Sequence, residues 1–143
     1  MTNNNNSLSE NINYANNDNN DNVLTIKTVQ IAPFRILMTA LKDILLDTNI
    51  LFTKEGIKII NMDKTHTILV HLFLQSVNFE FYECIYDKII IGVNMLHLFK
   101  LISTIDNDDT LTIYIEKDDY DDGVIQELGL KFENGDIKQS KIQ

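Results

Sequence analysis

Residues 23–46 read VLTIKTVQIAPFRILMTALKDILL, and this stretch decides the fold. In its first eight residues, 23–30, apolar and polar side chains alternate as they do in a half-buried β-strand. Pro33 then stands where the first turn of a helix tolerates the missing N–H. Apolar residues recur after it at helical spacing, namely Phe34, Leu37, Met38, Leu41, Ile44 and Leu45. The stretch therefore predicts a strand over 23–30 and a helix over 33–46.

The same order recurs in the second half of the chain. KIIIG (88–92) predicts a strand, Asn94 can cap a helix, and MLHLFKLIST (95–104) predicts that helix. Further short strands are expected at 49–53, 56–62, 67–74, 78–85, 110–116 and 124–132. Each unit is too small to bury its own helix, so the two should share one core. The sequence thus predicts an α+β fold of two β-α-β-β-β repeats, with a curved antiparallel sheet and both helices on one face.

Composition indicates one globular domain preceded by a tail. The chain has 143 residues, of which 44% are hydrophobic and 23% charged, and no apolar run is long enough to span a membrane. Residues 1–22 are rich in asparagine and contain no Lys or Arg, so we expect a disordered tail there and the folded domain at 23–132. The single cysteine, Cys84, excludes an intrachain disulfide, and the N-terminus lacks the pattern of a secretory signal. A reducing compartment is expected.

The chain is acidic, with a net charge of −9, so its overall field repels nucleic acids and anionic membranes. Any contact with DNA must therefore rest on a local patch. Arg35 and Lys42 lie seven residues apart on the first predicted helix, on the side opposite its apolar stripe, and Lys100 lies on the second. If both helices cover the same sheet face, these three form a weakly positive strip. The alternative is that they are ordinary solvated helix residues.

No pattern of residues predicts catalysis. The acidic run at 118–123 could suggest a calcium loop, but position 12 of such a loop would be Gly129 in place of the bidentate Glu, so a solvated hairpin turn is favoured. The three histidines, His66, His71 and His97, lack the spacing of a zinc site. A nucleophile–base pair is also missing, which leaves a small acidic hydrolase as a formal alternative only. We expect no metal, no cofactor and no enzymatic activity.

Three stretches together resemble a known family: ALKDIL (40–45), GIKIINMDKTHTILVHLFL (56–74) and IGVNMLHLFKLI (91–102). The most specific matches are Met62-Asp63 with His66, Tyr82 with Cys84, and Gly92-Val93-Asn94. The similarity runs in order through residues 23–131. On these motifs the chain resembles the N-terminal domain of the proliferating cell nuclear antigen (PCNA), the eukaryotic DNA sliding clamp.

The resemblance implies a ring of six such domains, usually two per chain in a homotrimer, whose helices line a hole for duplex DNA. Arg35, Lys42 and Lys100 match basic, DNA-facing positions of the family. Ile36 and Ser103 stand where the family often has lysine, which implies weaker contact. Such contact is non-specific, because a clamp holds DNA by encircling it.

The resemblance also implies a pocket for short hydrophobic peptides of partner proteins. Met62, His66 and Leu69 carry over to that pocket. The stretch 133–143 is expected to begin the connector to a second domain and to supply Ile137 or Ile142 as an apolar contact. The edge strand that pairs with the next subunit is expected at Val124, Ile125, Gln126, Glu127, Leu128, Gly129, Leu130 and Lys131.

The implied partners are duplex DNA, a DNA polymerase, other proteins with PCNA-interacting peptides, and a clamp loader. The expected function is the N-terminal half of a processivity factor for DNA replication and repair. The alternative is a checkpoint-clamp-like or paralogous protein-binding module that does not encircle DNA. A nuclear location is expected, or a cytoplasmic replication compartment if the protein is viral. Because the family has a second domain, the chain is expected to be a fragment of a longer protein. The alternative is that the isolated domain self-associates through the strand at 124–131.

Overall fold

The computed structural model describes residues 21–134 and 136–142. Its helices and strands are β1 (Asn22–Thr28), α1 (Ile31–Ile44), β2 (Asp47–Thr53), β3 (Gly56–Met62), β4 (Leu69–Gln75), β5 (Phe81–Cys84), β6 (Ile89–Asn94), α2 (Met95–Ile102), β7 (Thr110–Glu116), β8 (Tyr120–Asp121), β9 (Val124–Ile125), β10 (Leu128–Asn134) and β11 (Asp136–Ile142). Short 3-10 turns follow β4 and β7, at Ser76–Asn78 and Lys117–Asp119. The predicted tail lies outside the described residues except for Asp21 and Asn22, and Asn22 already begins β1.

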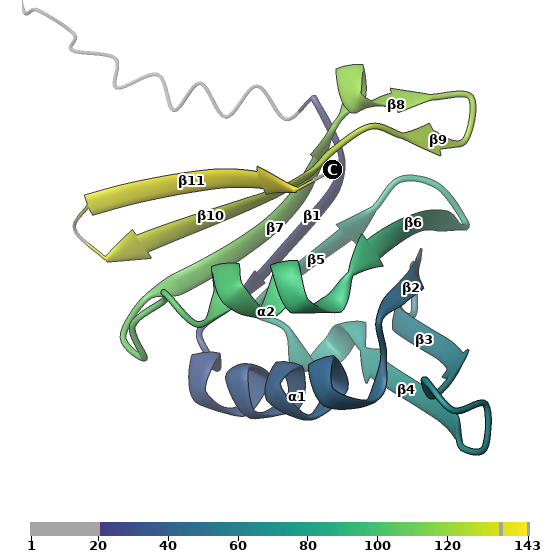
Figure 1. Cartoon of the computed structure of the whole chain (residues 1–143). Helices are drawn as coiled ribbons and strands as arrows, with labels where there is room; N and C mark the ends of the chain where they lie inside the picture. The colour runs from purple at the N-terminus through teal and green to yellow at the C-terminus, as the bar shows by residue number, and fades with distance from the viewer. Residues whose placement is uncertain (1–20, 135, 143) are drawn as a thin grey trace, which may run out of the picture.

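The strands form two principal antiparallel sheets. One has five strands in the order β11-β10-β7-β1-β5, and the other has four in the order β4-β3-β2-β6 (Figure 1). In the four-stranded sheet, β2, β3 and β4 of the first repeat are joined by β6, the first strand of the second repeat, which pairs with β2. In the five-stranded sheet, β7, β10 and β11 of the second repeat are joined by β1, the first strand of the first repeat, which pairs with β7. The two repeats are therefore interlocked. The predicted α+β class with antiparallel strands and two helices is confirmed, and hydrogen bonding divides the predicted curved sheet in two.

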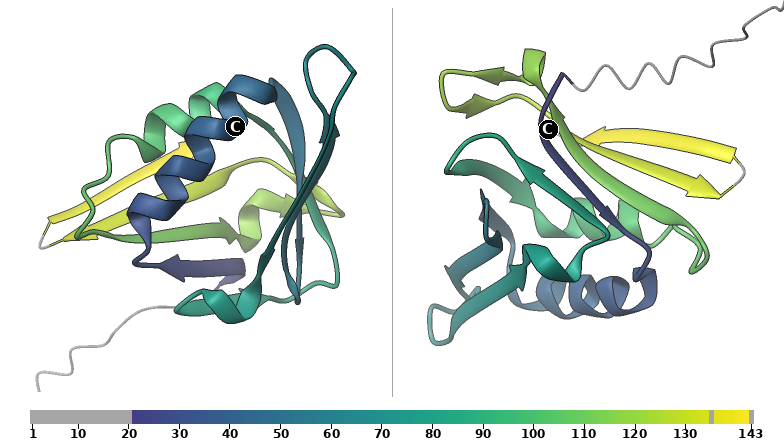
Figure 2. Two further views of the ribbon diagram at one scale, coloured as in Figure 1. Left: turned by 90° about the horizontal axis from the view of Figure 1, so that it is seen from below. Right: turned by 180° about the vertical axis from the view of Figure 1, so that it is seen from behind.

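The two helices lie side by side on one side of the molecule, as Figures 1 and 2 show. Met38 and Leu41 of α1 and Leu98 of α2 are buried in the core. Met38 and Leu98 meet residues of both sheets around an apolar cavity of about 30 Å³, which Ile50 and Ile113 also line. Its apolar lining favours a dry void, because a water molecule there would lack side-chain hydrogen-bond partners. The core therefore lies between the two sheets and beneath the helix pair.

The acidic run at 118–123 forms a hairpin turn, as predicted. β8 and β9 pair through Tyr120 with Ile125 and Asp121 with Val124. Asp122 and Gly123 between them have φ values of 45° and 88°. Two consecutive residues with positive φ are typical of the tight turn that matches the twist of a β-hairpin. The strand predicted over 124–132 is consequently broken, and β10 starts only at Leu128.

The last described residues add a strand to the five-stranded sheet. β11 pairs with β10 along its whole length, from Leu128 with Ile142 to Asn134 with Asp136. The expectation that 133–143 begins a connector is therefore corrected, because residues 136–142 belong to the sheet. The expected edge strand over 124–131 is corrected as well, since β10 lies between β7 and β11 and the outermost strand is β11.

Candidate DNA-facing helices and partner surface

Arg35 lies on the flank of α1 that faces the end of α2. Its guanidinium donates from Nη1 to the Asn107 side-chain oxygen over 2.9 Å and from Nη2 to the Ile105 carbonyl oxygen. Both acceptors belong to the loop that follows α2. The third nitrogen, Nε, is buried without a hydrogen-bond partner. Arg35 was predicted to stand opposite the apolar stripe, but its side chain instead fastens the α2–β7 loop to α1.

Lys42 occupies the same flank, two turns further along α1. Its ammonium nitrogen lies 2.7 Å from the Asp43 carboxylate and 4.8 Å from the centroid of the Phe99 ring on α2. The side chain is 21% exposed, against 68% for Asp43. A lysine over an aromatic face gains a cation–π attraction that grows as water is excluded. Lys42 therefore joins the two helices, and an adjacent carboxylate offsets its charge.

Lys100 is the cation of the helix layer that points into solvent. It lies in the last turn of α2 and is exposed. It takes part in none of the ion pairs or side-chain hydrogen bonds found among residues 21–134 and 136–142. Its carbonyl oxygen accepts a hydrogen bond from the Ser103 hydroxyl, which leaves the ammonium group unaffected. Of the three residues predicted to face DNA, Lys100 is thus the one whose charge is freely available.

The remaining exposed positions of the helix layer are mostly uncharged. Ile36 is 71% exposed and Leu96 is 46% exposed. Thr39 and Ala40 also face solvent. Asp43 adds a negative charge to the same layer. The structure therefore places the three predicted cations on adjacent helices, but the surface that they form is only weakly positive.

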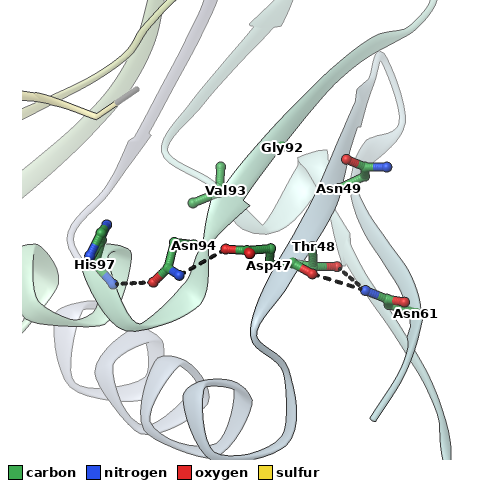
Figure 3. A pocket seen from close by; sticks show the side chains of 8 residues that line it. All are labelled: Asp47, Thr48, Asn49, Asn61, Gly92, Val93, Asn94 and His97. Carbon is green, nitrogen blue, oxygen red and sulfur yellow. Dashed lines mark hydrogen bonds between the residues drawn. The ribbon is translucent and has the colours of Figure 1, made fainter. Parts of the chain in front are cut away.

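The start of α2 is held by a polar network (Figure 3). The Asn94 side chain accepts a hydrogen bond from the His97 backbone N–H over 3.1 Å and donates to the Asp47 carboxylate over 2.8 Å. Asn61 donates to the Thr48 hydroxyl over 3.0 Å. These residues line an open cavity of about 460 Å³ where β2, β3 and β6 meet the helix. The Asn94 side chain thereby caps α2 and ties its N-terminus to β2.

Asp63 organises the loop between β3 and β4. Its carboxylate accepts hydrogen bonds from the backbone N–H groups of Thr67 and Ile68, over 2.8 and 2.9 Å, and from the Thr65 hydroxyl over 2.6 Å. The Thr65 hydroxyl and these N–H groups stabilise the ionised form and lower the pKa of Asp63 to about 2. His66 completes the turn with a φ of 58°. The sequence analysis identified Asp63 only as a match to the family and did not predict that it orders this loop. The spacing D-x-T-x-T, in which an Asp can bond to nearby hydroxyl and N–H groups, could have indicated that role.

This loop joins two exposed apolar residues. Met62 and Leu69 are direct partners in the β3–β4 register and are 43% and 65% exposed. His66 lies exposed in the loop between them. The structure therefore brings Met62, His66 and Leu69 together at one end of the β3–β4 hairpin.

Ile142 does not join these residues. It pairs with Leu128 in the five-stranded sheet and is 7% exposed. The β3–β4 hairpin belongs to the other sheet, at the opposite end of the molecule from the C-terminus in Figure 1. The assignment of Ile142 to the peptide pocket is corrected, because tertiary pairing draws the C-terminal residues into β11.

Residues 21–134 and 136–142 contain no cluster of three or more His, Cys, Asp or Glu side chains that could hold a metal ion. Neither α1 nor α2 is long and apolar enough to cross a membrane, and these ranges hold no other candidate span.

Similarity to known proteins was found at three levels. The family model described as "Proliferating cell nuclear antigen, N-terminal domain" matches residues 23–142. A "Probable DNA polymerase sliding clamp 1" from Paramecium bursaria Chlorella virus 1 is 38% identical over 100 residues, which are 69% of this chain and 38% of that protein. The "Proliferating cell nuclear antigen" of Dictyostelium discoideum is 33% identical over 88 residues, 61% of this chain and 33% of that protein.

A solved structure shows the same fold. The crystal structure of the proliferating cellular nuclear antigen from Entamoeba histolytica matches with a TM-score of 0.76 at 24% identity, covering 85% of this chain and 46% of that one. The chain thus spans less than half the length of each of these relatives. The family match, by contrast, extends from β1 to the end of β11. The chain therefore belongs to the family of proliferating cell nuclear antigen N-terminal domains.

Proposed function

We propose that this chain is the N-terminal part of a DNA sliding clamp, a processivity factor that encircles duplex DNA and holds a polymerase to it. The single observation that carries the proposal is the interlocked pair of repeats with two adjacent helices, in a chain whose family match covers residues 23–142. Family members generally tether other enzymes and catalyse no reaction themselves. The proposed site of action is the nucleus, or a cytoplasmic replication compartment in a viral host.

Ring assembly is supported by one outermost strand of each principal sheet. β11 ends the five-stranded sheet and β4 ends the four-stranded sheet. Unpaired backbone N–H and C=O groups at such edges favour pairing with another chain or domain. Two different edges on one domain allow head-to-tail pairing, which forms a ring when the rotation closes. We propose that these edges join six domains, as in a homotrimer of two-domain chains.

The helix layer is proposed to face the DNA. Lys100 supplies a free charge, while Lys42 and Arg35 lie beside it in internal contacts. A clamp that encircles DNA needs few phosphate contacts. The closed ring keeps it on the duplex, and each phosphate contact would have to break and re-form as the ring slides. At physiological salt the Debye length is about 8 Å, so an acidic chain can still present a weakly positive inner surface.

Partner proteins are proposed to dock at Met62, His66 and Leu69. These residues form an exposed apolar end to the β3–β4 hairpin, and Asp63 holds the connecting loop in one conformation. A pre-ordered loop reduces the entropy lost on binding. Methionine adapts its shape to different apolar side chains. The proposed occupants are short hydrophobic peptides of a polymerase, repair proteins and a clamp loader.

A release assay tests the encirclement. The protein, in its full-length natural form, is loaded on a nicked circular plasmid with its clamp loader, and the amount retained is measured by gel filtration. We expect retention on the circle, loss after a single restriction cut, and retention again when bulky proteins block both ends. Equal persistence on linear DNA with free ends, or no retention on the circle, would overturn the proposal and favour a module that does not encircle DNA.

A further inference from the structure

The outer face of the four-stranded sheet carries large apolar side chains in solvent. Ile60 is 58% exposed, Ile90 is 44% exposed, Phe73 is 39% exposed, and Leu51 is half-buried. Their strand neighbours point the other way, as Ile59 and Ile91 are buried in the core. An antiparallel sheet with one solvated face normally carries polar residues there. We call Leu51, Ile60, Phe73 and Ile90 the apolar strip.

The register makes this strip continuous. Leu51 pairs with Ile90 on one side and with Lys58 on the other, and Lys58 pairs with Phe73. One row of side chains therefore crosses all four strands. Ile60 is two residues from Met62 on the same face of β3, so the strip adjoins the Met62–Leu69 pair. Contiguous exposed apolar area of this kind marks interaction sites.

Charge on this face restricts the occupant. The outward positions of the four strands hold Lys58 and His71, and their one carboxylate is Asp47 at the far end of β2. The Lys58 ammonium nitrogen lies 5.0 Å from the centroid of the Phe73 ring, in the middle of the strip. Glu55 in the β2–β3 turn lies near enough to Lys58 for the two charges to interact. The outward strand positions next to Lys58, namely Leu51, Ile60 and Phe73, hold no carboxylate, so Lys58 favours a partner that brings apolar side chains and a carboxylate.

Two other occupants fit less well. A second copy meeting this face by two-fold symmetry would bring Lys58 toward its own counterpart, and like charges in contact are unfavourable. Nucleic acid would gain one lysine contact while covering four large apolar side chains. A peptide segment with both apolar and acidic residues satisfies both features.

We propose that the apolar strip is a second docking surface, which takes an acidic, apolar-rich segment adjoining the partner peptide bound at Met62 and Leu69. This inference rests on the proposed partner docking. The segment lies across β4, β3 and β2, with apolar side chains on Ile60, Phe73 and Leu51 and a carboxylate at Lys58. Partners with the same short hydrophobic motif are then ranked by the residues that flank it.

Synthetic fluorescein-labelled peptides test this surface by fluorescence anisotropy on the 143-residue chain. The probes are a core peptide with the short hydrophobic motif, the core with a six-residue Leu/Glu extension at either end, and the core with a Ser/Asn extension of equal length. We expect one Leu/Glu extension to tighten binding by about tenfold, the effect of burying one or two apolar side chains. The Ser/Asn extension should add nothing. Equal affinity of all the probes would overturn the proposal.

Variants of the chain show which residues account for the tighter binding of the Leu/Glu-extended peptide. The Ile60→Ser/Phe73→Ser double variant should lose the tenfold gain and keep the affinity for the core peptide, whereas Met62→Ser/Leu69→Ser should lose affinity for both. Val77→Ser is the matched control, because Val77 is 82% exposed and lies outside the strip. Lys58→Glu should reduce the gain from the Leu/Glu extension and leave the affinity for the Ser/Asn probe unchanged, because it removes the positive partner of the Glu carboxylate. A gain that survives Ile60→Ser/Phe73→Ser would place the segment elsewhere and overturn the assignment.

A separate measurement distinguishes failure of the strip from failure of the proposed function. The Leu/Glu segment alone is titrated into the 15N-labelled chain, and amide shifts are followed. Shifts at Ile60 and Phe73 without binding of the core peptide would refute the pocket at Met62 and Leu69 and keep the strip. Core binding without any shift at Ile60 or Phe73 would refute the strip and keep the pocket.

Discussion

In the helix layer, two of the three cations matched to DNA contacts are held by other parts of the chain, whereas on the outer face of the four-stranded sheet large apolar side chains stand in solvent. Arg35 ties down the loop after α2, and Lys42 packs on Phe99. Ile60 and Phe73, by contrast, contribute little to the core. Residue type alone therefore does not indicate function: two charged residues here stabilise the fold, and several apolar ones are available for binding.

The sharpest test of this comparison uses two consecutive isoleucines of β3. Ile59 is 2% exposed and Ile60 is 58% exposed. We expect Ile59→Ala to lower the free energy of unfolding by about 2–5 kcal/mol through lost burial and a new cavity. Ile60→Ala should change it by less than about 0.5 kcal/mol. Urea denaturation of the 143-residue chain measures both, and a similar loss for the two variants would remove the distinction between core and binding face.

Replacement of Arg35 tests whether this cation belongs to the fold. Arg35→Ala removes two hydrogen bonds from a charged group and leaves the Ile105 carbonyl without that donor. We expect a loss of about 2 kcal/mol in the free energy of unfolding. Lys100→Ala is the control and should be nearly neutral, because its side chain is exposed. If the Arg35→Ala chain is as stable as its parent, Arg35 does not stabilise the fold and remains a candidate for contact with DNA.

Asp63 provides a local test at the partner end of the sheet. Asp63→Ala removes the acceptor for the Thr67 and Ile68 N–H groups, so hydrogen exchange at these two amides should accelerate. The pKa of Asp63 falls from 3.8 to about 2 in the folded chain. The stabilisation is therefore present at neutral pH and is lost as the pH drops through that interval. After correction for the intrinsic exchange rate, the amides of Thr67 and Ile68 in the parent chain should be less protected at pH 2 than at pH 5. If neither Asp63→Ala nor the lower pH reduces their protection, Asp63 does not order the loop.

The smallest expected effect concerns DNA. Removing one phosphate contact makes the slope of log affinity against log salt shallower by about 0.9. We therefore expect Lys100→Ala to make the slope shallower by that amount for each protein chain whose Lys100 contacts a phosphate. Fluorescence anisotropy with labelled duplex DNA at several salt concentrations measures the slope. Thr39→Ala, an exposed neutral change on α1, serves as the control. An unchanged slope for Lys100→Ala would show that the helix layer of this chain does not contact phosphate.

Much of the fold could be predicted from local pattern. The first strand, the first helix and the cap at Asn94 each depend on neighbours along the chain, and all three are present. The half-buried alternation expected for the strand was wrong, because consecutive residues of β1 are buried, and Ile44 of the expected helical stripe is exposed. The hairpin at 118–123 followed in the same way from turn chemistry. What could not be predicted was β11, because residues 136–142 are mostly polar and form a strand only by pairing with β10. The misplaced edge strand and the misassigned Ile142 both follow from that one omission.

By itself the sequence determined the two strand–helix units, the family and the residues of interest, since periodicity and motifs are properties of the chain order. Only the tertiary structure decided which side chains remain available. Arg35 and Lys42 are engaged because α2 and its following loop pack beside α1. The apolar strip exists because the register of four strands aligns Leu51, Ile60, Phe73 and Ile90 on one face. Such availability depends on contacts between residues distant in the chain, which no local pattern encodes.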